Sequence, residues 1–495
     1  MRSLNAKSNP GLLSVGLALG LLFWAGCAVN PATGDPQLAL ISEEQEIELG
    51  RESDPKIVAS MGLYSDESLQ DYARDLGGAL AEDSERPHLP WTFRVLDEPV
   101  INAFALPGGY VYVTRGILPY LDSEAELAGV LGHEIGHVTA RHSVEQISRT
   151  ALAQIGPNLA GILGPRVQGA VGLVLAPLQL FDLKFSRDDE READALGVRY
   201  MIRQGYEPRE LGEVMAMLAA VSAAEGGGRI PEWLSTHPTP ENREENIREA
   251  AANTIITADP PRVGTEDYLP HLEGLVFGED PREGFFRENR FFHPGMAFEI
   301  ALPEGWEAKN LKQSLEGLSP GEDALLVLTL IEGSDPSAGL TAFASKEGVQ
   351  TSRTFRDPIN GIPAAITDFV YEVEGSTGQG QVGFLYHGGG LFQILGLGAP
   401  AGWGQNGAAI NRAIRSFRAV TDPEILNVQP ARIRLVTVPR AMSLEAILRQ
   451  EGALSEIEHV RRLNRLEGTP TLAEGRVLKI PSGARIPAGS GLGRT

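Results

Sequence analysis

The sequence predicts an α+β chain of several domains: a mainly helical domain with a small sheet, then an α/β sandwich-like domain, then a small strand-helix-helix-strand module. A chain of 495 residues is too long for one typical domain, so two to four are expected. Capped segments with helical apolar spacing dominate the first half, whereas β-type apolar runs dominate residues 284–417. An apolar content of 42% and a charged content of 22% are ordinary for folded protein.

Net charge and cysteine content exclude two classes of protein. The formal net charge of -22 argues against a nucleic-acid partner, because phosphate binding needs a basic surface. A single cysteine excludes an internal disulfide framework.

Residues 1–26 are predicted to be a secretory signal peptide. A short basic region precedes the apolar run Gly11–Gly26, which is too short to span a bilayer comfortably. The run ends in Trp24-Ala25-Gly26-Cys27, which resembles a bacterial lipobox with tryptophan in the usual place of leucine. Cys27 is therefore the expected lipidation site, the alternative being a signal-segment cysteine that is simply removed. Ala28 follows it, which in the lipoprotein resemblance favours an outer-membrane anchor and a periplasmic chain.

The first domain is expected over residues 27–262. Asn30–Asp35 is rich in Pro and Gly, which is typical of a tether, and Ser42 with Gln45 can form a capping box. The predicted elements then follow in this order: a helix over 66–81, strands over 92–96, 103–106 and 110–113, a helix capped by Ser123, a helix reaching Ile155, and helices over 185–203, 208–224 and 241–252. The apolar segment Ala151–Leu180 is broken by Gly-Pro pairs. It predicts a core helix pair with loops or, alternatively, a mobile lid or contact surface.

His133-Glu134-Ile135-Gly136-His137 lies inside the helix that Ser123 caps. Residues four apart on a helix face the same way, so His133 and His137 can present their imidazoles to one metal ion. Glu134 points elsewhere and can act as general base on metal-activated water. Zinc accepts this nitrogen and oxygen ligand set. The motif arises by chance in roughly one chain in a hundred of this composition, so its partners matter.

A catalytic zinc site needs a third protein ligand and an open position. Ser143 stands where an extended motif would place a third histidine, and His142 is expected to be a surface or capping histidine. The acidic run Ser186–Asp194 contains Glu190 and Asp194, four apart on a predicted helix. One carboxylate could bind the metal while the other orients a ligand histidine.

These features together resemble the HtpX and BepA group of gluzincin zinc endopeptidases. Beside the two motifs already described, the resemblance includes Asn102–Gly109 and Thr236-His237-Pro238 followed by Arg243, in the family order. It covers about residues 30–252. The resemblance implies a zincin-type domain with one zinc ion per chain.

The resemblance also implies a role for each matching residue. His133, His137 and Glu190 are zinc ligands, Glu134 is the catalytic base, and Asp194 orients a ligand. Asn102, Ala103, Phe104 and Ala105 form an edge to which an extended substrate adds as a strand. His237 either fills the open zinc position and holds the enzyme inactive or contacts the transition state, the alternative being a plain surface histidine. Arg243 either polarises the substrate carbonyl or holds the structure.

Two further domains are expected. Residues 275–422 weakly resemble α/β sandwich domains of the PsbP type and are expected to form a packing or protein-binding module. Residues 430–482 resemble LysM, a βααβ module that binds peptidoglycan. Ala441-Met442 replaces the usual Gly-Asp, which leaves the fold expected and glycan binding open.

The sequence therefore predicts a periplasmic, lipid-anchored zinc metalloendopeptidase. Its expected substrates are unfolded or misassembled envelope proteins, hydrolysed in quality control. One alternative is a chaperone or assembly lipoprotein that holds clients through its edge strand, with latent proteolysis. Another is a tether to the cell wall.

Overall fold

The computed structural model describes residues 27–155, 184–224, 232–237, 243–252, 260–373 and 376–483. The expected signal peptide and most of Ala151–Leu180 lie outside these residues. The chain divides into two compact units: unit 1 contains residues 63–275 and 434–480 with the N-terminal segment to Val58, and unit 2 is mainly residues 276–433. The mixed α+β class is confirmed, with helices first and sheets later. Among the helices of the described residues, none has the length and apolar character needed to cross a membrane.

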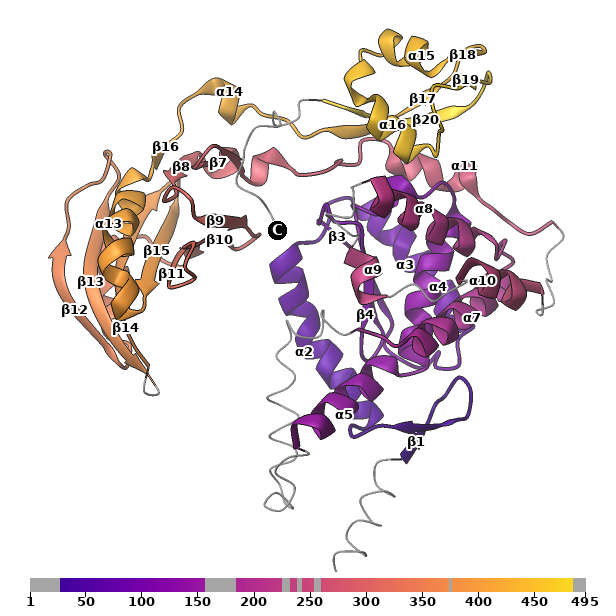
Figure 1. Cartoon of the computed structure of the whole chain (residues 1–495), viewed down its shortest axis with the longest axis horizontal. Helices are drawn as coiled ribbons and strands as arrows, with labels where there is room; N and C mark the ends of the chain where they lie inside the picture. The colour runs from indigo at the N-terminus through magenta and orange to yellow at the C-terminus, as the bar shows by residue number, and fades with distance from the viewer. Residues whose placement is uncertain are drawn as a thin grey trace, which may run out of the picture. The chain divides into compact units, whose positions relative to one another are not determined.

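Unit 1 is built mainly from helices (Figure 1). They are α2 (Glu43–Met61), α3 (Glu67–Glu82), α4 (Glu124–Thr139), α5 (His142–Ile155), α7 (Arg187–Arg203), α8 (Glu210–Ala224), α9 (Glu232–Thr236), α10 (Arg243–Ala252) and α11 (Thr265–Tyr268). The predicted capping residues are confirmed. The Ser123 side chain accepts a hydrogen bond from the backbone of Glu126, and Ser42 and Gln45 close their box on α2 at 2.9 and 3.3 Å.

Helix α4 is buried along its whole length and packs against α7 and α8. Glycines allow α4 and α7 to approach closely, because a Cβ atom added to Gly132 would lie 3.2 Å from the Cα atom of Gly197. A Cβ atom on Gly136 would lie 3.0 Å from the carbonyl oxygen of Ala193. This close approach brings the histidines of α4 beside the acidic side chains of α7.

A three-stranded sheet lies in the same unit. Its strands are β3 (Thr92–Leu96), β4 (Ala103–Leu106) and β5 (Tyr110–Thr114), in the order β3-β5-β4. Strand β5 is parallel to β3 and antiparallel to β4. Gly108 and Gly109 form the turn between β4 and β5 with positive φ angles of 84° and 101°. Strand β4 is therefore an edge strand, as predicted.

The segment Asn30–Asp35 is a hairpin turn, so the prediction of a tether is wrong. It joins β1 (Cys27–Val29) to β2 (Pro36–Leu38), which pair antiparallel. The side chain of Asn30 accepts hydrogen bonds from the backbone of Ala32 and Thr33. Gln37 donates to the carbonyl oxygen of Ala140 at 2.7 Å. The hairpin is thereby held against the residue that follows α4.

The C-terminal part of unit 1 is a small module of strands and helices. Its elements are β17 (Arg432–Thr437), β18 (Met442–Ser443), α15 (Leu444–Gln450), the 3-10 turn Leu454–Glu456, α16 (Ile457–Leu463), β19 (Thr471–Leu472) and β20 (Val477–Ser482). Strand β17 pairs with β20, and β18 pairs with β19. The predicted order of strand, helix, helix and strand is present. Its assignment as LysM-like stays a prediction.

This module contacts the N-terminal end of α4. Arg465 donates two hydrogen bonds to the carboxylate of Glu126, at 2.7 and 2.8 Å. The ammonium of Lys479 lies 2.8 Å from the carbonyl oxygen of Leu121 and 2.5 Å from the carboxylate of Asp122. Residues 434–480 therefore belong to the same compact unit as the helical domain.

Unit 2 is dominated by antiparallel sheets. A seven-stranded sheet has the order β12-β13-β14-β15-β11-β10-β9, and a four-stranded sheet has the order β16-β8-β7-β6. The strands are β6 (Phe285–Arg287), β7 (Arg290–His293), β8 (Phe298–Ala301), β9 (Glu307–Asn310), β10 (Ser314–Leu318), β11 (Ala324–Ile331), β12 (Val349–Phe355), β13 (Ala364–Val373), β14 (Ser376–His387), β15 (Gly390–Gly398) and β16 (Arg418–Ala419). The helices are α12 (Pro336–Ala344), α13 (Pro400–Ser416) and α14 (Pro423–Leu426). Helix α13 packs on β14 and β15 (Figure 1).

Candidate metal centre

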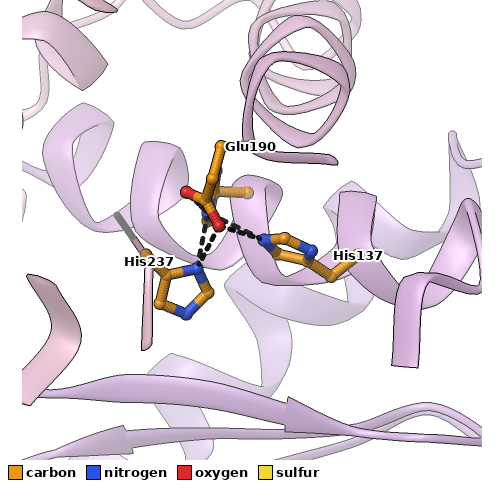
Figure 2. Close-up of side chains that lie close together, drawn as sticks. His137, Glu190 and His237 are labelled. Carbon is orange, nitrogen blue, oxygen red and sulfur yellow. Dashed lines mark hydrogen bonds and ion pairs between the residues drawn. The ribbon is translucent and has the colours of Figure 1, made fainter. Parts of the chain in front are cut away.

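Four buried side chains converge where α4 meets α7 and the end of α9. His133 and His137 come from α4, Glu190 from α7, and His237 directly follows α9. One ligand atom of each lies within 4.8 Å of the others. Figure 2 shows the Glu190 carboxylate with contacts to the rings of both His137 and His237. The predicted ligands are thus brought together, with His237 as a fourth.

The spacing of these atoms is close enough for all four to approach one zinc ion. Zinc bonds of about 2.0–2.1 Å place ligand atoms about 3.3 Å apart. The Nε2 atom of His133 lies 3.1 Å from Nε2 of His137 and 3.3 Å from Nδ1 of His237. The Oε1 atom of Glu190 lies 3.4 Å from Nε2 of His137 and 2.9 Å from Nδ1 of His237. Three nitrogens and one carboxylate oxygen are also donors that zinc accepts.

Asp194 and Arg243 support this cluster. The Oδ1 atom of Asp194 lies 3.0 Å from Nδ1 of His133, on the side of the ring that faces away from the cluster. Arg243 pairs with Asp194 through two hydrogen bonds of 2.8 Å. Both side chains are buried. Asp194 therefore holds the ring of His133 in place, and Arg243 holds Asp194.

Burial and the neighbouring charges set the ligands' protonation. Burial lowers the pKa of His137 well below its usual value, which favours the neutral ring that binds metals. Burial raises the pKa of Glu190, but His237 and His137 outweigh this effect and hold that pKa well below its usual value. The pKa of Asp194 is lowered, because Arg243 and His133 outweigh the effect of burial. The cluster thus offers a neutral imidazole and an ionised carboxylate, the forms that metals bind.

Glu134 lies beside the cluster and is fully buried. Its Oε1 atom accepts a hydrogen bond from the indole of Trp233 at 3.0 Å and lies 3.6 Å from Nε2 of His237. Its Oε2 atom has no hydrogen-bond partner among the residues that the structure describes. One oxygen is held in place while the other remains available, which suits a general base.

The predicted edge strand lies in the same unit, and α4 packs against it. The backbone of Thr114 donates to the carbonyl oxygen of Asn102 at 3.0 Å, with Ala103 paired to Val113 next along the ladder. Because bonded and non-bonded pairs alternate in antiparallel strands, Phe104 bonds to β5. The backbone groups of Ala103 and Ala105 then point away from β5, and of these two residues Ala103 is buried and Ala105 is partly exposed. Cys27 lies in β1, and its expected lipidation is untested.

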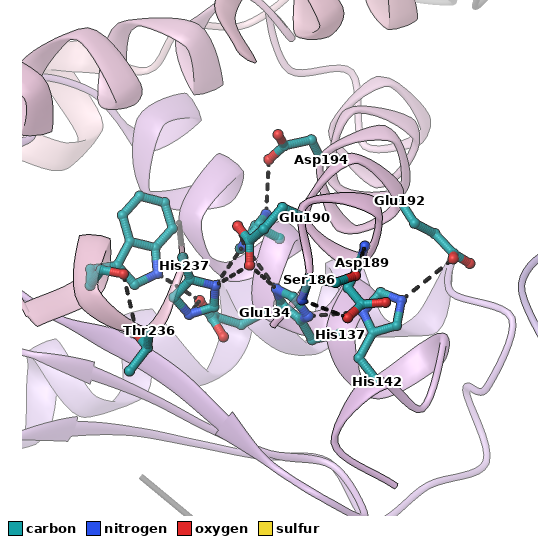
Figure 3. A network of polar contacts seen from close by, with 12 residues as sticks. Glu134, His137, His142, Ser186, Asp189, Glu190, Glu192, Asp194, Thr236 and His237 are labelled. Atoms are coloured by element: carbon teal, nitrogen blue, oxygen red, sulfur yellow. Dashed lines mark hydrogen bonds and ion pairs between the residues drawn. The ribbon is translucent and has the colours of Figure 1, made fainter. Parts of the chain in front are cut away.

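Two residues of the site were not predicted from the sequence. Trp233 holds Glu134 and lies one helical turn before His237, a spacing that could have indicated a shared face. His142 was expected to be a surface or capping histidine, and it is the first residue of α5. It is buried, with Nδ1 2.9 Å from Nδ1 of His137 (Figure 3), so the surface position is wrong. The chain reverses direction after α4, which brings His142 next to His137.

Comparisons with known proteins agree with this geometry. Residues 67–251 match Peptidase family M48. A beta-barrel assembly-enhancing protease of Yersinia pestis is 30% identical over 315 residues, which are 59% of this chain and 63% of the relative. The protein of that name from Escherichia coli K12 is 31% identical over 229 residues, 45% of this chain and 47% of the relative. Mitochondrial metalloendopeptidase OMA1 of Arabidopsis thaliana is 32% identical over 212 residues, 42% of each chain.

The chain thus covers less than two thirds of the length of each of these relatives. Among solved structures, the cyanobacterial PsbP of Synechocystis matches 28% of this chain and 94% of its own, at 14% identity and a TM-score of 0.23. The PsbP-type assignment of the middle domain stays a prediction.

Proposed function

We propose that the chain is a zinc-dependent endopeptidase, because residues 67–251 match peptidase family M48. The observation that carries the proposal is the convergence of four possible ligand atoms within 4.8 Å of one another, beside a buried glutamate with one available oxygen. His133, His137 and Glu190 would hold the zinc ion. A bound zinc ion supplies a Lewis acid that polarises a carbonyl and lowers the pKa of water.

Glu134 performs the proton transfers in this proposal. Its ionised carboxylate takes a proton from the attacking water through the available Oε2 atom and returns it to the leaving amine. The hydrogen bond from Trp233 keeps the carboxylate in one orientation between these steps. Arg243 pairs with Asp194 through two hydrogen bonds and lies 3.2 Å from Oε2 of Glu190, which favours a role in holding both carboxylates over direct contact with substrate.

We infer that the substrate binds as an extended strand along β4. The partly exposed Ala105 presents its backbone donor and acceptor on the side away from β5, and such groups pair with an added peptide strand. Recognition through backbone groups accepts many sequences but requires an unfolded segment. This fits unfolded or misassembled proteins as substrates. The names of the bacterial relatives, together with the lipobox-like Cys27, support envelope proteins as substrates and an outer-membrane anchor.

A second candidate is an assembly factor with latent proteolysis. His237 favours it, because its Nδ1 atom lies among the other three ligand atoms and could fill the position where a catalytic site keeps water. In this form the chain would hold clients through β4, and hydrolysis would require His237 to withdraw.

The Glu134→Gln variant tests the proposal. It should bind one zinc ion per chain, because no ligand is removed, and lose at least about a thousandfold of its peptide hydrolysis, because the base is lost. Zinc is measured by mass spectrometry and hydrolysis with fluorescent casein. Glu48→Gln on the exposed face of α2 is the matched control. Full activity in Glu134→Gln would exclude the proposed base.

A further inference from the structure

His142 is a buried residue that the mechanism above does not use. It begins α5, and its ring lies between a metal ligand and a carboxylate (Figure 3). Its Nδ1 atom is 2.9 Å from Nδ1 of His137, and its Nε2 atom is 3.4 Å from Oε2 of Glu192. Its side chain is 1% exposed.

The direction of each hydrogen bond follows from the orientation of the His137 ring. Its Nε2 atom faces the cluster, 3.1 Å from Nε2 of His133. A neutral ring that offers Nε2 to a metal carries its proton on Nδ1 and donates from there. Nδ1 of His142 must then accept, which places the proton of His142 on Nε2. The ring of His142 then donates a hydrogen bond from Nε2 to Glu192. One tautomer of each ring therefore satisfies every hydrogen bond between His137, His142 and Glu192.

Glu192 is itself fixed by the N-terminal hairpin. The side-chain amide of Asn30 donates to Oε1 of Glu192 at 2.7 Å. Asn30 is 5% exposed, and its own oxygen is occupied by the backbone of Ala32 and Thr33. Both carboxylate oxygens of Glu192 therefore have partners. The series runs from the hairpin through Glu192 and His142 to the metal ligand.

The two ligand histidines of α4 are thus oriented in different ways. His133 meets the carboxylate of Asp194 directly, at 3.0 Å. His137 has no carboxylate at this position; a second imidazole connects it to Glu192. A partner of this kind fixes the tautomer and the ring angle of a ligand histidine, and its loss typically weakens metal binding by about 10- to 100-fold.

We propose that His142 is the positioning residue of ligand His137, held in its accepting tautomer by Glu192 and Asn30. The inference rests on the proposed zinc site, because only a metal-facing Nε2 makes His137 donate from Nδ1. It also gives the N-terminal hairpin a function, because its residue Asn30 holds Glu192 in place. Asn30 is three residues from the expected lipidation site Cys27.

Two substitutions separate a positioning role from simple packing. His142→Phe keeps an aromatic ring beside Phe185 but removes the acceptor. His142→Asn loses ring volume but keeps an oxygen near the position of Nδ1. Positioning predicts that the phenylalanine variant binds zinc about 10- to 100-fold more weakly and that the asparagine variant stays within about threefold of the wild type. Packing predicts the reverse order.

The experiment measures the zinc dissociation constant of the full chain by competition with a chromophoric chelator. His88→Phe is the matched control, because His88 is exposed and pairs with Glu43 outside this series. Circular dichroism of the metal-free variants verifies folding. Equal zinc affinity of His142→Phe and wild type, or failure of His142→Asn to restore binding, would overturn the proposal.

The Asn30→Asp variant tests the far end of the series and serves if His142 variants do not fold. It keeps the oxygen that closes the turn but replaces the donor with a second carboxylate facing Glu192. Zinc affinity should fall at least severalfold, and unchanged affinity would contradict the link to the hairpin. If wild-type protein itself binds no zinc, the proposed function fails and this inference with it. If wild type binds zinc and these variants do so equally, only the inference fails.

Discussion

At the residue scale, we propose that His237 determines whether the metal centre is open or closed. Its Nδ1 atom lies 3.3 Å from Nε2 of His133 and 2.9 Å from Oε1 of Glu190, so it lies within the cluster of possible ligands. Burial lowers the pKa of His237, but Glu190 and Glu134 outweigh this effect, and the pKa is raised. The carboxylates of Glu190, a proposed ligand, and of Glu134, the proposed base, therefore both attract His237.

The His237→Ala variant should retain zinc, because three protein ligands suffice for a catalytic site, and should hydrolyse casein severalfold faster than wild type. The faster rate is expected because the fourth position becomes available to water. Zinc content and initial rates at equal protein concentration measure the effect. Retained zinc with a large loss of activity would instead assign His237 to contact with the transition state.

Sequence reasoning succeeded at residues whose relation is local. Four-residue spacing on one helix predicted that His133 and His137 share a face, and the same spacing predicted that Glu190 and Asp194 act together. His142 was missed, because its contact depends on Arg141, which adopts a left-handed φ of 60° and ends α4. No periodicity in the sequence encodes this reversal of the chain.

At the scale of elements, β4 is the proposed substrate-binding strand, and the N-terminal end of α4 is the part that Arg465 and Lys479 contact. Strand β4 was predictable, because its apolar run and the Pro-Gly-Gly turn are both local. The hairpin at Asn30–Asp35 was not, because Pro and Gly occur equally in linkers and tight turns. Its position depends on contacts such as Gln37 with Ala140, 103 residues apart in the sequence.

Replacement of Ala105 by proline should lower kcat/KM by at least about tenfold and leave zinc content and folding unchanged. Proline removes a backbone donor that points away from β5 and spares the bonds of Phe104 to β5. Ala105→Val is the matched control, because it retains the donor. Equal kcat/KM in the two variants would argue against strand addition along β4.

Arg465→Met should destabilise unit 1 by about 3 kcal/mol at pH 8, because Glu126 would be left as an unpaired buried carboxylate. Burial raises the pKa of Glu126 to about 7, although Arg465 opposes the shift. Between pH 4.5 and about 7, Glu126 is therefore protonated in the folded state and ionised in the unfolded state. In the wild type this group's contribution to stability falls as pH rises from 4.5 to about 7 and is constant above.

The cost of Arg465→Met should accordingly be smaller at pH 5, where Glu126 is protonated and needs no cation. Urea unfolding at pH 5 and pH 8 measures both values. Arg461→Met, which removes an exposed pair with Glu458 in the same module, should cost little at either pH. A cost for Arg465→Met that does not change with pH would show that Glu126 does not titrate in this range.

At the scale of the whole molecule, unit 2 is inserted into unit 1. The sequence did not predict this, because the contact between Arg465 and Glu126 joins residues 339 positions apart. Unit 2 begins and ends in neighbouring strands: the backbone of Phe277 donates to the carbonyl oxygen of Ala431 at 2.8 Å, and Val276 is paired with Arg432. In unit 1, Leu435 donates to Glu273 at 2.7 Å.

Replacement of residues 277–431 by an Asn-Gly turn should therefore leave unit 1 folded, loaded with zinc and active, since two paired strands can be joined by two residues. Truncation after Leu275 should be more damaging, because it removes Arg465 and Lys479 from the N-terminal end of α4. Melting temperature and zinc content distinguish these outcomes. Equal stability of the two variants would contradict the assignment of residues 434–480 to unit 1.

The most direct test of the central claim is an anomalous difference map from zinc-loaded crystals, recorded at the zinc absorption edge. The account predicts one strong peak about 2.0–2.2 Å from the Nε2 atoms of His133 and His137 and from the carboxylate of Glu190. Absence of a peak at this position in crystals shown to contain zinc, or a peak bound by other residues, would contradict it.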